Sequence, residues 1–259
     1  MRRRAVTAGP HWGDAYYGEL YLASVADLLT PRLSALEAAA VAALVRLAPG
    51  ERILDLACGH GRHARVLAGR ARVVGLDRCA AYLGRGAAAA VGPAPAWVRG
   101  DVRALPFRGG AFDAAFSWYA SLFMFDDRVN EACLAEAARV VRRGGRVLIH
   151  HANPLRLALE PRASARRALA DGSVVEEESE FDAARGVDRC ARRLVRPDGS
   201  VLAGTAELRY YMPTEWGRLA ERAGLRLVEL TTTTDAGRAP RREQGPESPD
   251  LIALLEKPT

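Results

Sequence analysis

A short apolar segment that runs directly into a glycine turn is the feature that most constrains the fold of this chain. Residues 52–57 (RILDLA) read as a buried strand that a single carboxylate, Asp55, interrupts. Gly59 and Gly61 follow at once, and residues 63–70 have the spacing of a helix. A strand that passes through a glycine turn into a helix is how a doubly wound α/β sheet presents a nucleotide site. We therefore expect an α/β fold with a ligand at this turn.

Asp55 narrows the choice of ligand. A carboxylate facing the turn would repel a pyrophosphate, whereas it suits a ligand that carries an amino group. The segment LDLACGHG resembles motif I of the class I S-adenosylmethionine (AdoMet) methyltransferases, and the chain is most similar to their small-molecule, natural-product tailoring type. In that family the loop wraps the methionine part of the cofactor. The resemblance implies that Asp55, Ala57, Gly59 and Gly61 hold or support AdoMet.

A second carboxylate follows the next strand. Residues 72–77 (RVVGLD) predict a strand, and Asp77 falls 18 residues after Gly59, close to the interval at which Rossmann-like folds place an acid on the ribose hydroxyls. The alternative is that Asp77 only caps a helix beginning near Cys79. We favour ribose binding and add the neighbouring Arg78 to the predicted cofactor site.

Residues 97–102 (WVRGDV) predict a third strand that ends in Asp101, so a third carboxylate is expected at a strand end. Gly100-Asp101-Val102 resembles the family's G-D-[VA] sequence, in which the carboxylate holds the adenine amino group and the next backbone N–H holds a ring nitrogen. The alternative is a simple turn residue. The resemblance therefore implies adenine binding by Asp101 and Val102.

The catalytic candidates lie at strand ends and in the N-terminal segment. Residues 112–118 predict a fourth strand, which places Ser117 in the cofactor site and Tyr119 in the crevice. The tetrapeptide SWYA stands where nucleic-acid amino-methyltransferases usually carry an N-P-P-Y-like sequence, so it disfavours a nucleic-acid substrate. His150 ends the fifth strand, and His151 should point to the opposite face. We predict His150 as a base or orienting group.

Residues 11–29 contain four aromatic side chains and read either as a packing helix or as a lid over the cofactor. We favour the lid, as in related methyltransferases. Tyr17 then touches the cofactor and the acceptor, with Tyr16 in reserve for the same role.

The expected fold is a doubly wound, mostly parallel sheet of about seven strands with a reversed last strand, helices on both faces, an antiparallel β insertion and an N-terminal helical lid. Within a single methyltransferase domain spanning residues 1–259, the lid is residues 1–32, and the core is residues 33–153 and 213–259. Residues 174–181, 188–196 and 201–211 predict three strands connected by hairpins, so we expect residues 154–212 to form an antiparallel insertion that covers the substrate.

Three local expectations complete the fold. A helix should span residues 126–143 and end at a turn made by Gly144 and Gly145. Residues 176–178 (EEE) read as an acidic solvent-facing stretch rather than as a site for a cationic substrate. The polar residues 231–249, rich in Pro and Gly, predict a mobile connection.

Composition excludes several other classes. The net charge is +6, but the basic residues are spread along the chain and form no dense block, which makes nucleic acid an improbable partner. The four cysteines show no metal-binding or disulfide spacing, and we expect neither a metal nor a cysteine nucleophile. No segment approaches the roughly 20 apolar residues of a membrane span, and the polar start disfavours a signal peptide. We expect a cytoplasmic protein with a small-molecule substrate, and the sequence leaves a homo-oligomer open.

The favoured reaction is AdoMet-dependent N-methylation of a bacterial natural product, such as an amino-sugar or lincosamide-like compound. The alternatives are O-methylation of a small molecule, RNA methylation, and an AdoMet-binding protein that transfers no methyl group. An NAD-dependent oxidoreductase would explain the glycines and Asp77, but it leaves Asp55 and Asp101 without a role.

Overall fold

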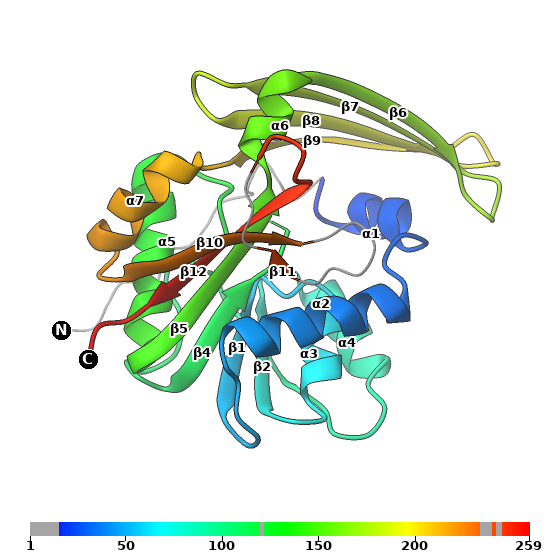
Figure 1. Ribbon diagram of the computed structural model, residues 1–259. Coiled ribbons are helices and arrows are strands. Elements are labelled where there is room, and N and C mark those ends of the chain that lie inside the picture. The colour runs from blue at the N-terminus through cyan, green and yellow to red at the C-terminus, as the bar shows by residue number, and fades with distance from the viewer. Residues whose placement is uncertain (1–15, 120–121, 234–239, 242–244) are drawn as a thin grey trace.

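The computed structural model describes residues 16–119, 122–233, 240–241 and 245–259. Its centre is an eight-stranded sheet with the order β11-β10-β12-β5-β4-β1-β2-β3 (Figure 1). The strands are β1 (Arg52–Leu56), β2 (Arg72–Asp77), β3 (Ala96–Arg99), β4 (Phe112–Ser117), β5 (Val141–Ala152), β10 (Arg226–Thr233), β11 (Pro240–Arg241) and β12 (Asp250–Glu256). Strands β1 to β5 are mutually parallel, and β12 runs antiparallel to β5 and β10. The expected fold class, with its reversed last strand, is confirmed.

Helices cover both faces of this sheet (Figure 1). They are α1 (Glu19–Val25), α2 (Pro31–Leu44), α3 (Arg62–Leu67), α4 (Ala80–Ala88), α5 (Asp127–Val140), α6 (Pro154–Leu159) and α7 (Trp216–Arg222), the last preceded by the short 3-10 helix η2 (Pro213–Glu215). Because successive strand residues point to opposite faces, Ile53 packs in a cluster with α2 and α3, whereas Leu54 and Leu56 pack with α5 and α7. The side chains of β1 thus contribute to both hydrophobic clusters, one on each face of the sheet.

A second, antiparallel sheet stands over one end of the first (Figure 1). Its order is β6-β7-β8-β9, with β6 (Arg162–Ala168), β7 (Val174–Asp182), β8 (Val187–Val195) and β9 (Val201–Arg209). We predicted the last three strands from sequence, but neither β6 nor α6. The sequence RASARRA of β6 lacks the β-branched and aromatic residues typical of strands. It forms an exposed edge through backbone pairing with β7 and ion pairs such as Arg162–Glu180.

The helix expected over residues 126–143 ends earlier, and the predicted glycine turn is wrong. Helix α5 ends at Val140, and β5 begins at Val141. The pairing of β4 with β5 shifts between Phe112 and Ala114, so the two glycines lie in an irregular part of β5. Gly144 has φ +70°, and its N–H donates to the carbonyl of Lys257 over 2.8 Å. These glycines allow close backbone approach inside the sheet instead of capping a helix.

Two other predicted boundaries also change. Asp101 was expected to end the third strand, but β3 ends at Arg99 and Asp101 forms an isolated bridge with Ala104. The mobile connection predicted for residues 231–249 is wrong at its start, where residues 231–233 form the buried end of β10. Residues 234–239 and 242–244 of that connection lie outside the described residues.

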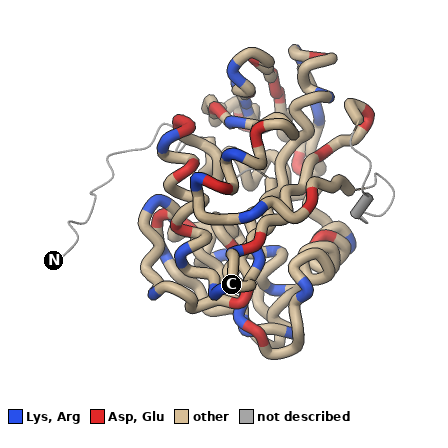
Figure 2. Tube along the Cα trace, turned by 60° about the vertical axis from the view of Figure 1, so that its left-hand side comes forward, with Lys and Arg blue, Asp and Glu red and all other residues tan. Residues whose placement is uncertain are grey.

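Charged residues of both signs are interspersed along the chain trace (Figure 2). On the outward face of the second sheet they pair across strands, as in Arg189–Glu207 and Arg193–Glu176. The view in Figure 2 shows no continuous basic stripe of the kind that follows a nucleic-acid backbone.

Gly61 offers a direct test of how closely the glycine turn packs. Its φ is +65°, and an added Cβ would lie within the ring of Trp97. We predict that Gly61→Ala lowers the free energy of unfolding by about 2–4 kcal/mol, because it adds both backbone strain and overpacking. Urea unfolding of the purified protein measures this change.

The matched control is Gly84→Ala, in the exposed middle of α4 with nothing within 4 Å of the added Cβ. This substitution should raise stability by up to about 1 kcal/mol, because alanine is the better helix former. Equal effects of both substitutions would contradict the described packing of the turn.

Candidate functional site

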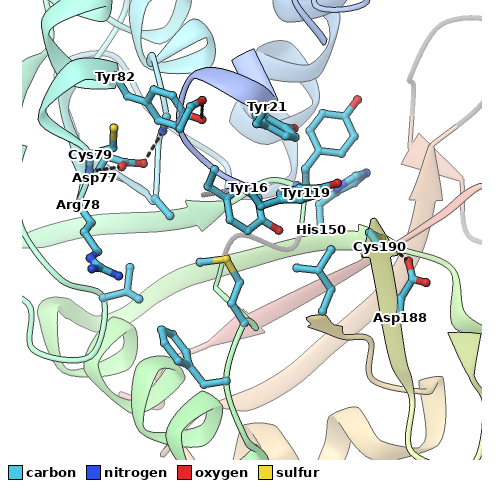
Figure 3. Close-up of a pocket in the computed structure, with 18 of the residues that line it drawn as sticks. Tyr16, Tyr21, Asp77, Arg78, Cys79, Tyr82, Tyr119, His150, Asp188 and Cys190 are labelled. Atoms are coloured by element: carbon cyan, nitrogen blue, oxygen red, sulfur yellow. Dashed lines mark hydrogen bonds between the residues drawn. The ribbon is translucent and has the colours of Figure 1, made fainter. Parts of the chain in front are cut away.

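A cavity of about 760 Å³ lies between the carboxyl ends of the parallel strands and the inner face of the second sheet (Figure 3). The floor includes the glycine turn after β1 and the residues after β2 and β3, and the roof comes from β7, β8 and β9. The segment around α1 closes a third side. The predicted site residues that line the cavity are Tyr17, Ala57, Gly59, Asp77, Arg78, Asp101, Val102, Tyr119 and His150, and the reserve residue Tyr16 joins them.

Asp77 holds the glycine turn in shape. One oxygen of its carboxylate accepts a hydrogen bond from the Gly59 N–H and the other from the Cys79 N–H, each over 2.8 Å. Ala57 and Gly59 both have positive φ, at +53° and +58°. Burial raises the pKa of Asp77, and the backbone donors oppose the shift. Because each carboxylate oxygen can accept a second hydrogen bond, Asp77 can also receive hydroxyl groups of a ligand.

Three predicted cofactor residues lie behind the cavity and do not line it. Asp55 is 2% exposed, and one of its carboxylate oxygens has no hydrogen-bond partner among the described residues. Burial raises its pKa well above the usual range, with Arg62 opposing the shift. Gly61 caps α3, and Ser117 is fully buried in β4. Asp55 and Gly61 therefore sit where they can support the turn from beneath.

Asp101 lines the cavity with its carboxylate already engaged. Arg103 donates to both of its oxygens, the shortest contact being 2.6 Å. Burial would raise the pKa of Asp101, but the Arg103 guanidinium outweighs burial and lowers it. The Arg103 guanidinium also lies 5.1 Å from the centre of the Phe125 ring. Asp101 is thus fixed as an oriented, negatively charged acceptor next to Val102.

His150 is held on both ring nitrogens by the protein. Its Nδ1 accepts from the Tyr119 backbone N–H over 3.2 Å, which leaves Nε2–H to donate to Asp250 over 3.1 Å. The ring stacks on Trp118 at 4.1 Å. Burial works against ionisation of Asp250, but hydrogen bonds from His150 and Thr233 lower its pKa. With both nitrogens engaged, His150 is suited to positioning Tyr119 and less to removing a proton from a substrate.

Tyr119, which follows β4 and lines the cavity, has a strained backbone with φ +62°. Its hydroxyl donates to Glu37 over 2.9 Å, and Arg62 lies 5.4 Å from its ring centre. Glu37 is fully buried and also pairs with Arg62 and His63. Although burial opposes it, these partners lower the pKa of Glu37 to about 2. A buried ion network therefore fixes the tyrosine ring at the cavity wall.

The other tyrosines of the cavity form a cluster beneath the roof. The ring centres of Tyr16 and Tyr17 lie 4.9 Å apart, and those of Tyr17 and Tyr21 lie 5.6 Å apart. Burial raises the pKa of all three, and also that of Tyr210. Their hydroxyls consequently stay protonated at neutral pH. They can donate hydrogen bonds and shape the cavity, but they cannot act as phenolate bases.

The segment that carries these tyrosines bridges the core and the second sheet. The Tyr82 hydroxyl of α4 donates to the Gly18 carbonyl over 2.8 Å, and Arg196, after β8, pairs with Glu19 over 2.6 Å. Leu20 packs with Val175 of β7 and other roof residues. The described part of the predicted lid therefore covers the cavity, while residues 1–15 lie outside the described residues.

The sequence predicted a covering insertion, but not the side chains through which this roof lines the cavity. Residues on β7 and β8 that line the cavity include Glu177, Ser179, Asp188, Cys190 and Arg192. The prediction that residues 176–178 form a solvent face is wrong for Glu177, which lines the cavity and pairs with Arg192 over 2.7 Å. The period-2 pattern of Asp188, Cys190 and Arg192 was the available signal. Which face of the strand meets the cavity became evident only from the fold.

The described residues bear on two other classes of site. They contain no group of three His, Cys, Asp or Glu side chains placed to hold a metal ion. Over the same part of the chain, no helix combines the length and the apolar character that a membrane span requires.

Comparison with known proteins gives matches to methyltransferases. Residues 53–145 match the family model described as a methyltransferase domain. The chain is 36% identical over 115 residues to the 2-phytyl-1,4-naphtoquinone methyltransferase of Synechocystis sp. This match covers 40% of this chain and 45% of that protein. It is 37% identical over 102 residues to the demethylmenaquinone methyltransferase of Beutenbergia cavernae, covering 39% of this chain and 40% of that protein. The chain thus spans less than half the length of these curated relatives.

Two solved structures are similar over nearly the whole chain. The CcbJ methyltransferase from Streptomyces caelestis has a TM-score of 0.77 and 24% identity, and the match covers 94% of this chain and 98% of that one. The sugar N-methyltransferase KedS8 from Streptoalloteichus sp. has a TM-score of 0.70 and 19% identity, and the match covers both chains fully. At such identities the likeness establishes the fold alone, including the second sheet.

The buried network around Glu37 predicts a pH-dependent contribution to stability. A carboxyl whose pKa falls from 4.5 to about 2 on folding stabilises the folded state above pH 4.5, and this contribution is lost as the pH falls through 2. We predict that the difference in unfolding free energy between wild type and Glu37→Gln shrinks by about 3 kcal/mol from pH 6 to pH 2. Chemical unfolding at several pH values measures it.

The matched control is Glu178→Gln on the exposed face of β7. Its difference from wild type should stay nearly constant over the same pH range. A Glu37→Gln difference that also stays constant would contradict the account of the network.

Proposed function

We propose that this chain, which carries a class I AdoMet-dependent methyltransferase domain, transfers the methyl group of AdoMet to an amine of a small molecule. The observation that carries the proposal is a shared cavity in which the glycine turn and Asp77 face a roof of polar side chains. Such a cavity can take two ligands side by side, with the cofactor on the floor and the acceptor under the roof.

The floor residues fit AdoMet. Asp77 is positioned to accept from the ribose hydroxyls, and Asp101 with the Val102 N–H can hold the adenine edge. The positive φ angles of Ala57 and Gly59 bring the backbone close to the methionine part, with Asp55 buried beneath it. Bound AdoMet supplies an electrophilic methyl group on a sulfonium sulfur.

The protein's own contribution is alignment and exclusion of water. The α1 segment and the roof enclose the acceptor, and the strained Tyr119 lies at the cavity wall with its hydroxyl held by Glu37. Tyr16, Tyr17 and Tyr21 stay neutral and can orient the acceptor by hydrogen bonds. We assign Tyr17 and Tyr119 to acceptor and cofactor contact, and His150 to positioning Tyr119.

A small acceptor is supported by the enclosure. A polynucleotide needs an open, positively charged track, whereas this cavity is roofed and the charges in Figure 2 are mixed. An amine acceptor draws support from the fold shared with a sugar N-methyltransferase and from the acidic side chains of the roof. Synthesis of a bacterial natural product is the setting we favour, in line with a further structure of similar fold, the amino pentose methyltransferase CalS10 from Micromonospora echinaspora, which is involved in calicheamicin biosynthesis.

A second candidate is a quinone-type acceptor. It is favoured by the 36% identity to naphthoquinone methyltransferases over 115 residues and by the tyrosine-rich cavity wall. It gives no role to the carboxylates of the roof, so we rank it second.

The cofactor site is tested by Asp77→Ala. Loss of the ribose contacts and of the turn's hydrogen bonds should weaken AdoMet binding about 100-fold or more, since charged hydrogen bonds contribute about 1.5–3 kcal/mol each. Calorimetric titration measures the affinity, and circular dichroism checks the fold. Asp198→Asn removes the same charge from an exposed hairpin turn and should bind as wild type does. Wild-type affinity in Asp77→Ala would refute the cofactor assignment.

The reaction is tested with acceptors that differ only in one group. We expect the protein to form S-adenosylhomocysteine and a singly methylated product from amino sugars, and none from the matching neutral sugars, with mass spectrometry as the readout. Turnover of naphthoquinols with none of the amines would favour the second candidate instead.

A further inference from the structure

The roof of the cavity has an ordered row of polar side chains. On β8, Asp188, Cys190 and Arg192 are two residues apart and share the inner face, and all three line the cavity. Their partners on β7 are Phe181, Ser179 and Glu177. The row thus runs from an acid, through a thiol and a hydroxyl, to an ion pair (Figure 3 shows Asp188 and Cys190).

The charges in this row do not balance. Arg192 is neutralised by Glu177 over 2.7 Å, and its guanidinium lies over the rings of Tyr16 and Tyr21 at 4.9 and 5.2 Å. Asp188 is 5% exposed, and no described Arg, Lys or His forms an ion pair with it. A buried carboxylate without a cation is unfavourable unless a ligand provides one.

The carboxylate of Asp188 is held in place with room for more donors. The Ser179 hydroxyl donates to Oδ1 over 2.6 Å, and the Cys190 thiol donates to Oδ2 over 3.2 Å. Each oxygen can accept a second hydrogen bond. Neither donor is charged, so both orient the group without neutralising it.

The negative charge of Asp188 affects the pKa of two other groups that line the cavity. Burial is the largest cause that raises the pKa of Tyr210 and of Cys190, and the next is Asp188. Both groups line the same cavity. Neutral tyrosine rings and one fixed carboxylate make a surrounding that suits an organic ammonium ion.

We infer that Asp188, oriented by Ser179 and Cys190, binds the protonated amine of the acceptor and selects amines over the corresponding alcohols. Before methyl transfer the ammonium would give one proton to the Asp188 carboxylate, which frees the nitrogen lone pair for attack. The inference rests on the proposed function and names the chemical class of its acceptor. An ammonium group donates charge-assisted hydrogen bonds to the carboxylate. A hydroxyl in its place would leave the buried charge uncompensated.

The test compares two probes of equal shape, cyclohexylamine and cyclohexanol, by calorimetric titration of the full chain with and without S-adenosylhomocysteine. In wild type we expect the amine to bind about 10- to 100-fold more tightly than the alcohol. Asp188→Asn should abolish this preference, and Asp188→Glu should retain part of it. Glu180→Gln removes one charge from the exposed side of β7 and should leave the preference intact.

Several outcomes would overturn the inference. They are equal binding of amine and alcohol by wild type, binding of neither, and a preference that survives in Asp188→Asn. Should Asp188→Asn fail to fold, Ser179→Ala keeps the charge but frees the carboxylate, and it should reduce the preference. AdoMet binding is measured on the same samples. Absence of AdoMet binding in the wild type would contradict the proposed function. AdoMet binding by the wild type without a preference for the amine would contradict only the role of Asp188.

Discussion

The hydrogen bonds from Gly59 and Cys79 to the Asp77 carboxylate are the interaction on which the site depends. They join the turn after β1 to the turn after β2, where both strands end at the same edge of the sheet. This acid satisfies the Gly59 N–H within the positive-φ backbone of the turn at the cavity floor. A single carboxylate thereby shapes the loop and faces the ligand.

Two buried acids support the opposite wall in the same way. Glu37 holds the Tyr119 hydroxyl, and Asp250 holds His150, which in turn accepts from the Tyr119 backbone. The strained residue is fixed from both sides by groups that the low dielectric makes costly to separate. Catalysis by alignment needs this kind of rigid wall, because AdoMet brings its own reactive group.

The core and the cofactor floor were predictable because local signals determine them. A short apolar run interrupted by Asp55 marks β1, and the positions of Asp77 and Asp101 follow from their strands. The side chains that line the roof were not predictable from the sequence. A polar side chain such as Glu177 looks solvated until its tertiary contact with Arg192 is known. The strand β6 gave no propensity signal, and the engagement of both His150 nitrogens depends on Asp250, which is 100 residues away in sequence. The fold class is confirmed, while the roles of the individual site residues stay predictions.

The central claim is that the floor of this cavity is an AdoMet site. Its most direct measurement is calorimetric titration of the purified protein with AdoMet, S-adenosylhomocysteine and NAD in parallel. We predict micromolar or tighter binding of the first two and no binding of NAD, because residues 53–145 match a methyltransferase domain. Binding of NAD alone would contradict the account and make the glycine turn a dinucleotide site.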